Sequence, residues 1–438
     1  MKKMNRINKF ALVLITGLVQ GLAAQDRMSL DRAVNLALSN NLELQIARND
    51  AQIAHNNNTP GNAGQLPEVT LNASDNPSLM NINQKFTNGT VIERNNVFSH
   101  SANANVLATY TLYNGSRISA GKKRLEFEYL AATNLMQSRI QTIISQVISS
   151  YSNIVKEQKY LELLKHLNEL SGQRLDIVKS RQAAGLANNT DLYLAQLDLE
   201  TQKQNLIAQE GIIRNAYTSL NMLLNIRVDS VYAVEDFLLR ESPLQKTGLD
   251  SLIMQNPDIR VAQAQLEIAI QMQKEIGAAR LPLVQMSAAY VYNISQSQAG
   301  FSLYNQSTGP QAGIGISIPL FTGGVNQKNY DNAKLNVQSN EWRQQQTLLT
   351  VQGLYSQAWQ DYATAKAQLQ SDSVAIQTAK SYIDLMQQRF SAGQNTIIEL
   401  KESQRSYEET YFRYINNQYI ARLSETQLMG LTGQLVRY

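Results

Sequence analysis

One unit is written twice in this sequence, and the duplication limits what the chain can fold into more than any other feature. Four landmarks of the first half recur in the second half in the same order. They are Asn41-Leu42-Glu43-Leu44 with Asn256-Pro257-Asp258-Ile259, Leu66-Pro67-Glu68-Val69 with Leu281-Pro282-Leu283-Val284, Leu112-Tyr113-Asn114-Gly115 with Leu320-Phe321-Thr322-Gly323, and RQAAG at 181–185 with RFSAG at 389–393. The spacing shrinks once, after the second pair, so we expect a longer loop in the first copy within about 75–100.

Each copy ends in two very long predicted helices. No proline interrupts residues 116–184, and apolar residues recur every seven positions in both copies. These positions are Ile140, Val147, Ile154 and Leu161 in the first copy and Leu348, Tyr355, Tyr362, Leu369, Ile376, Ile383 and Phe390 in the second. A seven-residue spacing kept over this length is typical of helices packed as in a coiled coil. Because a short glycine turn separates the helices of each copy, we expect helical hairpins at about 116–226 and 325–431.

Two segments before each helical hairpin, at about 66–113 and 281–320, alternate apolar and polar residues. This alternation predicts strands with one apolar and one polar face. The runs extend over about ten residues, the length of a strand that crosses a membrane. Inside a bilayer every backbone polar group must be paired, so such strands have to close into a barrel, and four strands are too few for closure. We therefore expect several copies of the chain to pool their strands.

The amino terminus and the composition narrow the class of protein. Residues 1–24 carry four cations, then an uncharged run and small residues, which is the pattern of a removed signal peptide. A membrane anchor fits less well, because the run is shorter than the ~20 residues that span a bilayer. Without those cations the formal net charge of +4 disappears, and a near-neutral chain lacks the basic surface that nucleic acid requires. The absence of cysteine excludes disulfides and thiol chemistry.

No group of residues forms a recognisable enzyme site. His55, His100 and His166 fall on different predicted elements, and no metal-ligand spacing, phosphate-binding loop or nucleophile with its base is present. We expect neither catalysis nor a cofactor. The predicted organisation is a signal peptide at 1–24, a first repeat at 25–228, an inter-repeat linker at 229–248 and a second repeat at 249–438.

The ordered landmarks, in duplicate, resemble the TolC-like outer-membrane efflux proteins over residues 28 to about 433. This resemblance implies a chain that is mainly α with a β-barrel part, four membrane β-strands and long coiled-coil-like helices in two tandem repeats. Three copies would complete a 12-stranded β-barrel and an α-helical barrel, anchored by outer-membrane lipid and extending into the periplasm. The homotrimer would meet a periplasmic membrane-fusion adaptor and an inner-membrane transporter of the RND or ABC type.

The function that this resemblance implies is a passive exit duct of a tripartite efflux or type I secretion-like system, which conducts small molecules or proteins to the exterior. Two other interpretations stay open on the residues alone. One is a non-transporting structural trimer of the envelope, and the other is a soluble periplasmic coiled-coil protein. Neither explains the duplicated strand pair as economically as a duct does.

The resemblance also places a gate after the second glycine turn. Family members carry two acids there, three residues apart, and Glu399 and Glu402 occupy those positions. At that spacing both lie on one face of a helix. Three copies would bring six carboxylates to a constriction, which would select cations and bind divalent metal ions. Acids in the first turns of a helix also favour its macrodipole without any role in a gate.

Family members hold this gate shut with links from an acid after the first glycine turn to a Tyr and an Arg near the second. Asp191 matches the acid, but Phe390 and Asn395 stand where the Tyr and the Arg are expected. Without a phenol or a guanidinium, any latch here must differ or be weaker. Asp191 also stands at a helix start, where it could cap the helix. The turns at Gly185-Leu186 and Gly393-Gln394 are the expected adaptor-docking tips.

Overall fold

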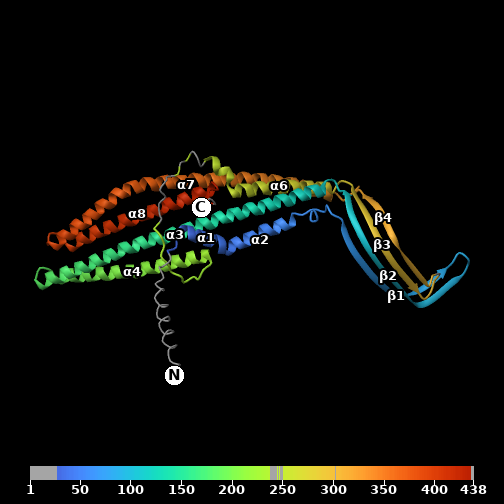
Figure 1. Cartoon of the computed structure of the whole chain (residues 1–438), viewed down its shortest axis with the longest axis horizontal. Coiled ribbons are helices and arrows are strands. Elements are labelled where there is room, and N and C mark those ends of the chain that lie inside the picture. Colours follow the sequence, from blue (N-terminus) through green and yellow to red (C-terminus); the bar gives the residue numbers. More distant parts are fainter. Residues whose placement is uncertain (1–26, 237–243, 245, 247–249, 301, 436–438) are drawn as a thin grey trace, which may run out of the picture. The chain divides into compact units, whose positions relative to one another are not determined.

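The structure, a computed structural model, describes residues 27–236, 244, 246, 250–300 and 302–435. The predicted signal peptide at 1–24 and much of the linker predicted at 229–248 lie outside the described residues. In chain order the helices are α1 (Leu30–Asn40), α2 (Leu42–Asn57), α3 (Arg117–Ala183), α4 (Asn189–Leu224), the 3-10 helix η1 (Asp250–Gln255), α6 (Pro257–Ala278), α7 (Val325–Ser391) and α8 (Ile397–Leu431) (Figure 1). The strands are β1 (Glu68–Lys85), β2 (Val91–Tyr113), β3 (Leu283–Ser297) and β4 (Tyr304–Ser317).

Contacts divide the chain into two compact units that cut across the two repeats. The helix unit comprises the described parts of 1–48, 136–257 and 348–438, and the sheet unit comprises 49–135 and the described parts of 258–347. Each unit takes segments from both halves of the sequence. The prediction of a mainly α-helical chain with four strands in two tandem copies is confirmed.

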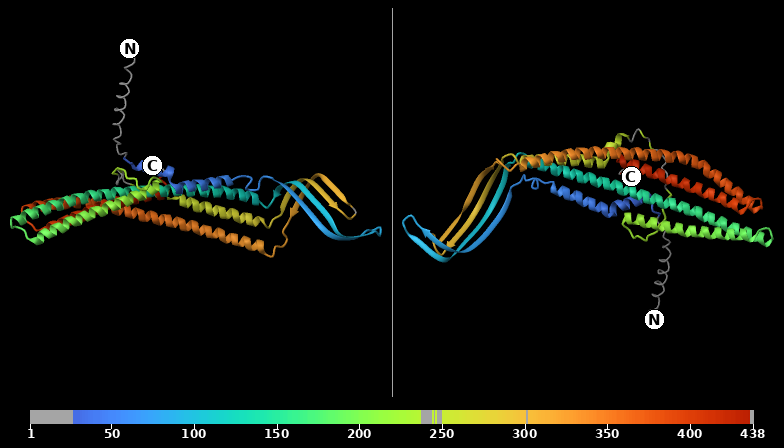
Figure 2. Two further views of the ribbon diagram at one scale, coloured as in Figure 1. Left: turned by 90° about the horizontal axis from the view of Figure 1, so that it is seen from below. Right: turned by 180° about the vertical axis from the view of Figure 1, so that it is seen from behind.

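The four strands of the sheet unit form one antiparallel sheet in the order β1-β2-β3-β4 (Figures 1 and 2). Its register sorts the residues by type, because side chains that are paired across strands share a face. One face carries exposed apolar residues: Val69 and Leu71 of β1, Val106, Tyr110 and Tyr113 of β2, Met286, Tyr290 and Tyr292 of β3, and Ile314 and Ile316 of β4. The predicted alternation is therefore real, and its apolar side has no cover within the described chain.

The opposite face of the sheet is polar and holds a ladder of side-chain amides. Asn72 Nδ2 donates to Asn105 Oδ1 at 3.1 Å, and Asn105 Nδ2 donates to Asn103 Oδ1 at 3.2 Å. Asn103 donates in turn to Asn293 of β3. These bonds tie β1, β2 and β3 together through uncharged amide groups that can also contact water.

The first strand pair differs from the expectation of a longer loop. β1 and β2 have 18 and 23 residues, whereas β3 and β4 have 15 and 14. The extra residues of the first copy extend both strands, which meet in a tight turn where Phe86 N–H donates to Thr90 O at 2.8 Å. The sequence did not reveal this extension because residues 76–96 are largely polar, so alternation in apolarity disappears there although the strands continue.

Two of the repeated landmarks meet at the base of the sheet. Gly115 has a φ of +66°, and a Cβ added to it would lie 2.6 Å from Leu281 Cδ1. Only glycine tolerates both this backbone conformation and this close approach. The glycine that closes the first strand pair and the leucine that precedes the second are therefore parts of one contact.

Two antiparallel helical hairpins make up most of the helix unit, α3 with α4 and α7 with α8 (Figure 2). None of the seven-residue positions in this unit is exposed, and five of them are buried: Val147, Ile154, Tyr355, Ile383 and Phe390. The chain thus forms the packed seam that this spacing predicts. Among the described residues, no helix is both long and apolar enough to span a membrane.

Helix α1 and the start of the described chain pack on the first hairpin. Tyr151 is fully buried among Val34, Val147 and Leu220. Its hydroxyl donates to Met28 O at 2.7 Å and accepts from Glu235 N–H at 2.7 Å. One tyrosine on α3 therefore fastens both the amino-terminal segment and the segment that follows α4.

Candidate functional site

The turns of the two helical hairpins are built alike. Leu186 N–H donates to Arg181 O at 2.8 Å, and Gln394 N–H donates to Arg389 O at 2.8 Å. In each turn the preceding residue is a glycine with positive φ, +72° at Gly185 and +77° at Gly393. This pattern is a Schellman motif, which ends a helix by satisfying its last carbonyl groups. Leu186 is left 79% exposed at its turn, which is unusual for a large apolar side chain.

Both acids at the starts of the second helices belong to capping boxes. Asp191 N–H donates to Asn188 Oδ1 at 2.9 Å, and Asn188 N–H lies 3.5 Å from Asp191 Oδ2. Glu399 N–H donates to Thr396 Oγ1 at 3.2 Å, and Thr396 N–H donates to Glu399 Oε2 at 2.7 Å. Hydrogen bonds from the backbone and hydroxyl of Thr396 hold the pKa of Glu399 below its usual value.

Glu402 stands almost one helical turn beyond Glu399, and both side chains are exposed. The hydrogen bond from Arg405 to Glu409 raises the pKa of Arg405, and the nearby charge of Glu402 adds to that shift. At the two candidate gate acids one carboxylate is therefore engaged in a helix cap, while the other lies beside a cation.

Phe390 and Asn395 take structural positions within the second hairpin. Phe390 is 2% exposed and packs with Leu175, Val178, Met386 and Leu400. Asn395 Nδ2 donates to Met386 O at 3.1 Å. The structure brings neither residue to the carboxylate of Asp191, whose partner is its own cap residue Asn188.

A different link joins the tips of the two hairpins. The guanidinium of Arg181, at the end of α3, donates from Nη2 to the backbone oxygen of Phe390. Its Cζ also lies 4.8 Å from the centre of the Phe390 ring. This combines a charge-assisted hydrogen bond with a cation–π contact at one residue of the second copy.

A second link between the hairpins is a buried charge cluster closer to the middle of the helices. Arg174 Nη1 of α3 lies 3.1 Å from Asp198 Oδ2 of α4, and the two residues are 1% and 4% exposed. Ser171 Oγ donates to the same carboxylate at 2.8 Å. Lys401 and Gln404 of α8 complete the cluster, Lys401 Nζ at 3.3 Å from Asp198 Oδ1 and Gln404 as acceptor from Arg174 Nη2.

Burial lowers the pKa of Arg174, while the charge of Asp198 opposes that shift. The guanidinium stays charged, because the pKa of an arginine starts far above physiological pH. Neither Nε nor Nη1 of Arg174 makes a well-directed hydrogen bond, so the contact with Asp198 is ionic. Arg174 depends on Asp198, since without that carboxylate its charge would be buried without compensation.

Sequence patterns did not identify these linking residues. Arg181 is the first residue of the repeated landmark RQAAG, and Arg389 is its counterpart in RFSAG. Only Arg181 links the hairpins, whereas Arg389 is exposed, and the repeat gives no sign of this difference. A usable signal existed for the buried pair. Arg174 and Asp198 lie equally far before and after Leu186, and residues placed in this way face each other in an antiparallel hairpin.

A two-faced sheet and two long helical hairpins are the features by which this fold defines a membrane duct protein. The family model described as outer membrane efflux protein matches residues 33–225 and 248–434. Toluene efflux pump outer membrane protein TtgI of Pseudomonas putida is 24% identical over 92% of this chain and 85% of its own. Cation efflux system protein CusC of Escherichia coli is 25% identical over 70% of this chain and 67% of its own.

The solved structure of the outer-membrane channel OprN shares the fold, with a TM-score of 0.80, 17% identity and coverage of 92% of this chain and 90% of that one. The family match covers most of the sequence, and the chain belongs to the outer membrane efflux protein family. It is therefore a component of the outer membrane that serves export, and it is not an enzyme. The two non-transporting interpretations of the sequence are set aside.

Proposed function

We propose that three copies of this chain close into one duct, and the observation that carries this proposal is the two-faced sheet. An exposed apolar face suits lipid, and a polar face with an amide ladder suits water. In the order β1-β2-β3-β4, β1 and β4 each keep one unpaired edge within the described chain. A sheet in a bilayer has to pair such edges. Three copies of four strands give the 12-stranded barrel expected from the sequence, and the helical hairpins form the periplasmic part of the wall.

The duct works with partners that supply energy and direction. A periplasmic membrane-fusion adaptor docks at the turns of Gly185-Leu186 and Gly393-Gln394, and an inner-membrane transporter of the RND or ABC type delivers the cargo. The names of the relatives support a small-molecule cargo, since one is a toluene efflux pump protein and another a cation efflux protein. The chain itself conducts passively.

The periplasmic end carries the gate. Glu399 and Glu402 from three copies form an acidic ring, with Asp191, Phe390 and Asn395 in the surrounding tip. Exposure of both glutamates supports this assignment, because a buried carboxylate could not face passing ions. The capping box of Glu399 does not oppose it, since one oxygen of the carboxylate, Oε1, makes no hydrogen bond that involves Thr396.

Single-channel recording tests the duct and the gate together. The mature protein is placed in planar bilayers, and the Glu399→Gln, Glu402→Gln double variant is compared with Asp176→Asn, which removes an exposed charge from α3. We expect discrete cation-selective openings that lose selectivity only in the double variant. Unchanged selectivity would remove the glutamates from the gate. Silence of folded trimers, with and without the adaptor, would overturn the duct itself.

Docking at the tips has its own test, which uses the absence of cysteine from the chain. Leu186→Cys and Gln394→Cys are combined with a short thiol-to-amine cross-linker and the adaptor, and Leu197→Cys on the exposed side of α4 is the control. Cross-links at the two turns but not at the control support docking there. Equal yields at all three positions would speak against it.

A further inference from the structure

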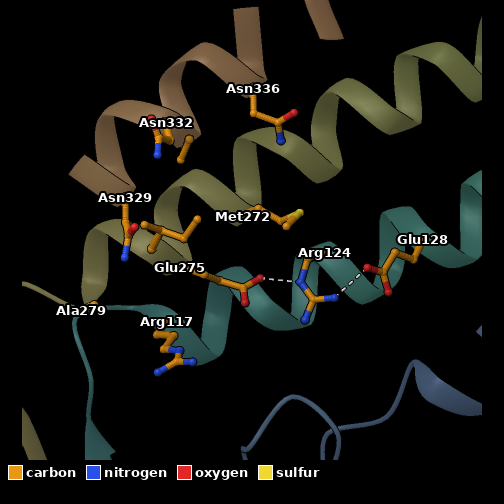
Figure 3. Close-up of a pocket in the computed structure, with 11 residues that line it drawn as sticks. Arg117, Arg124, Glu128, Met272, Glu275, Ala279, Asn329, Asn332 and Asn336 are labelled. Carbon is orange, nitrogen blue, oxygen red and sulfur yellow. Dashed lines mark hydrogen bonds and ion pairs between the residues drawn. The ribbon is translucent and has the colours of Figure 1, made fainter. Parts of the chain in front are cut away.

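Two open cavities lie side by side at the base of the sheet unit, between the start of α3, the end of α6 and the start of α7. The first has a volume of about 660 Å³ and is shown in Figure 3. Its charges neutralise each other. Arg124 Nε donates to Glu275 Oε1 at 2.7 Å, and Arg124 Nη1 donates to Glu128 Oε1 at 2.6 Å. This cavity has no need of a charged ligand.

The second cavity, of about 720 Å³, has a different charge balance. Lys123 of α3, Lys274 of α6 and Arg280 contribute three cations to its lining, and no carboxylate lines it. Within the described chain, no carboxylate oxygen lies within 4.0 Å of a side-chain nitrogen of these three cations. Three uncompensated positive charges around one hollow create a strong local field for an anion.

The polar groups around the second cavity also suit an anion. Ser116 and Ser119 line the cavity at the amino-terminal end of α3, which has no acid in its first turn. The hydroxyl of Ser119 donates to Ser116 O at 2.9 Å, so Ser116 supplies the hydroxyl for a ligand. The dipole of a helix start attracts negative charge, while the amides of Arg117, Ile118 and Ala120 already donate to Asn114 and Ser116. Gln271 also lines the cavity, and it is 4% exposed with its Oε1 unpartnered. A half-turn of this buried amide presents its Nε2 donor to a ligand.

Two contacts fix the guanidinium of Arg280 at the rim of this cavity. Its Cζ lies 3.9 Å from the centre of the Tyr330 ring, and its Nη1 donates to Gln327 Oε1 at 3.1 Å. The ring comes this close because position 277 is a glycine, whose added Cβ would lie 3.2 Å from Tyr330 Cε2. A guanidinium fixed in this way loses little conformational freedom when it binds an anion.

The cavity borders the apolar face of the sheet. Gly115 and Leu281, which line it, adjoin the end of β2 and the start of β3. Leu112, Tyr113 and Leu281 are each between 44% and 49% exposed here. An anion in the cavity would thus have apolar side chains immediately on its strand side and cations on its helix side. A small water-soluble anion gains nothing from the neighbouring apolar side chains, whereas an amphipathic anion can place its apolar part against them.

We propose that this cavity binds the phosphate group of an anionic phospholipid, with the acyl chains lying along the apolar face of the sheet. The inference rests on the outer-membrane placement of the strands, which brings the strand ends to the level of the lipid headgroups. Lys123, Lys274 and Arg280 hold the phosphate, and Ser116 and Gln271 add hydrogen bonds. The neighbouring cavity stays empty of lipid, because the two cations in its lining, Arg117 and Arg124, are balanced by the carboxylates of Glu128 and Glu275.

Thermal unfolding of the full mature protein in detergent micelles tests the site without requiring a conducting channel. Three probes are compared: phosphatidylglycerol, phosphatidylcholine, and inorganic phosphate. A ligand that binds only the folded state raises the midpoint of unfolding in a concentration-dependent way. We expect a rise with phosphatidylglycerol that is absent with phosphatidylcholine and with inorganic phosphate at the same concentration.

The variant Lys123→Gln, Lys274→Gln should weaken the apparent affinity for phosphatidylglycerol by roughly tenfold or more, given the contribution of each lysine at an anionic surface. The control Arg343→Gln, Lys380→Gln makes the same change of charge at exposed positions of α7 and should leave the affinity unchanged. An equal response to inorganic phosphate would identify a soluble ligand instead of a lipid. Loss in the control as well, or no response to phosphatidylglycerol, would overturn the site. A missing channel current with intact lipid binding would count against the duct alone.

Discussion

The guanidinium of Arg181 lies over the ring of Phe390, 4.8 Å from its centre, and donates a hydrogen bond to the backbone oxygen of the same residue. Arg181 is in the last turn of α3 and Phe390 in the last turn of α7. The equivalent arginine of the second copy, Arg389, is exposed. The two copies therefore contribute different groups to one contact: the first copy supplies the donor, Arg181, and the second copy supplies the acceptor, Phe390 O.

Replacing Arg181 by lysine should loosen the tip of the second hairpin. Lysine keeps the charge but loses the planar group that stacks and donates at once. We expect a local loss of about 1–2 kcal/mol. Hydrogen exchange of the amides around 386–395 should accelerate by roughly 5- to 30-fold. Arg389→Lys is the matched control and should leave these rates unchanged; equal acceleration in both variants would contradict the assigned link.

Removing one member of the buried pair should damage the helix unit strongly. Asp198→Ala leaves the charge of Arg174 buried, which costs about 3–5 kcal/mol. Asp176→Ala, at an exposed residue 3.9 Å from Lys179, should change stability by less than about 0.5 kcal/mol. Scanning calorimetry of both variants in micelles measures the difference.

The double variant Arg174→Met, Asp198→Leu separates the two causes of that loss. Well-packed apolar residues often replace a buried ion pair at no cost, so the double variant should regain most of the stability of the parent protein. A double variant as unstable as Asp198→Ala would mean that the ionic contact itself stabilises the fold.

Gly115→Ala should destabilise the sheet unit by more than the strain of positive φ alone. A methyl group there would lie 2.6 Å from Leu281 Cδ1, whereas nothing lies within 4 Å of a Cβ at Gly89, which has a φ of +87°. Gly89→Ala therefore reports strain only, of about 1 kcal/mol. We expect Gly115→Ala to cost about 1–3 kcal/mol more. The added variant Gly115→Ala, Leu281→Ala should recover the excess, as measured by thermal unfolding.

The stabilising effect of Tyr151 should disappear in alkali. Burial raises the pKa of this phenol to about 12, above the value near 10 of an unfolded tyrosine. The contribution of a group with a raised pKa is complete below the unfolded value and is lost as the pH rises through the folded value. Tyr151→Phe should be less stable by about 1–3 kcal/mol at pH 8, since Met28 O and Glu235 N–H lose their partner.

As the pH rises from 10 to 12, the stability gap between the parent protein and Tyr151→Phe should shrink, because only the parent must protonate this phenol to fold. Unfolding midpoints of both proteins at four or five pH values give the measurement. Buried tyrosines remote from Tyr151 affect both proteins equally and cancel in the difference, whereas Tyr217 and Tyr232 interact with Tyr151 and contribute to it. A gap that stays constant to pH 12 would show that Tyr151 does not titrate in this range.

Most of the fold could be predicted because its signals repeat. Val147, Ile154, Tyr355 and Ile383 follow a spacing that a packed helix seam requires, and the structure buries each of them. The lengths of β1 and β2 escaped prediction for a physical reason. Their outer halves are mostly polar, and the apolar residues there, such as the adjacent Leu79 and Met80, do not alternate with polar ones. Period two in apolarity reports a strand only where one face meets an apolar medium.

The candidate site was less predictable because its contacts join separate helices. The capping boxes of Asp191 with Asn188 and of Glu399 with Thr396 are local, and their spacing is visible in the sequence. Arg181 and Phe390 come from different copies, and no spacing rule connects them. Among the three cations of the second cavity, Lys123 comes from a segment far from that of Lys274 and Arg280, and the fold alone brings them together.

The matched lengths of α3 and α7, each 67 residues, have a consequence for how this gene can change. The tips meet through Arg181 and Phe390 only if both copies keep the same number of turns, since one added turn would shift a tip by about 5.4 Å. Insertions in one helix are therefore tolerated only with a matching insertion in its duplicate. The strand pairs already differ in length between the two copies. Insertions after the duplication were therefore accepted at the turn ends of the strands, but along the helices the two copies had to keep equal lengths.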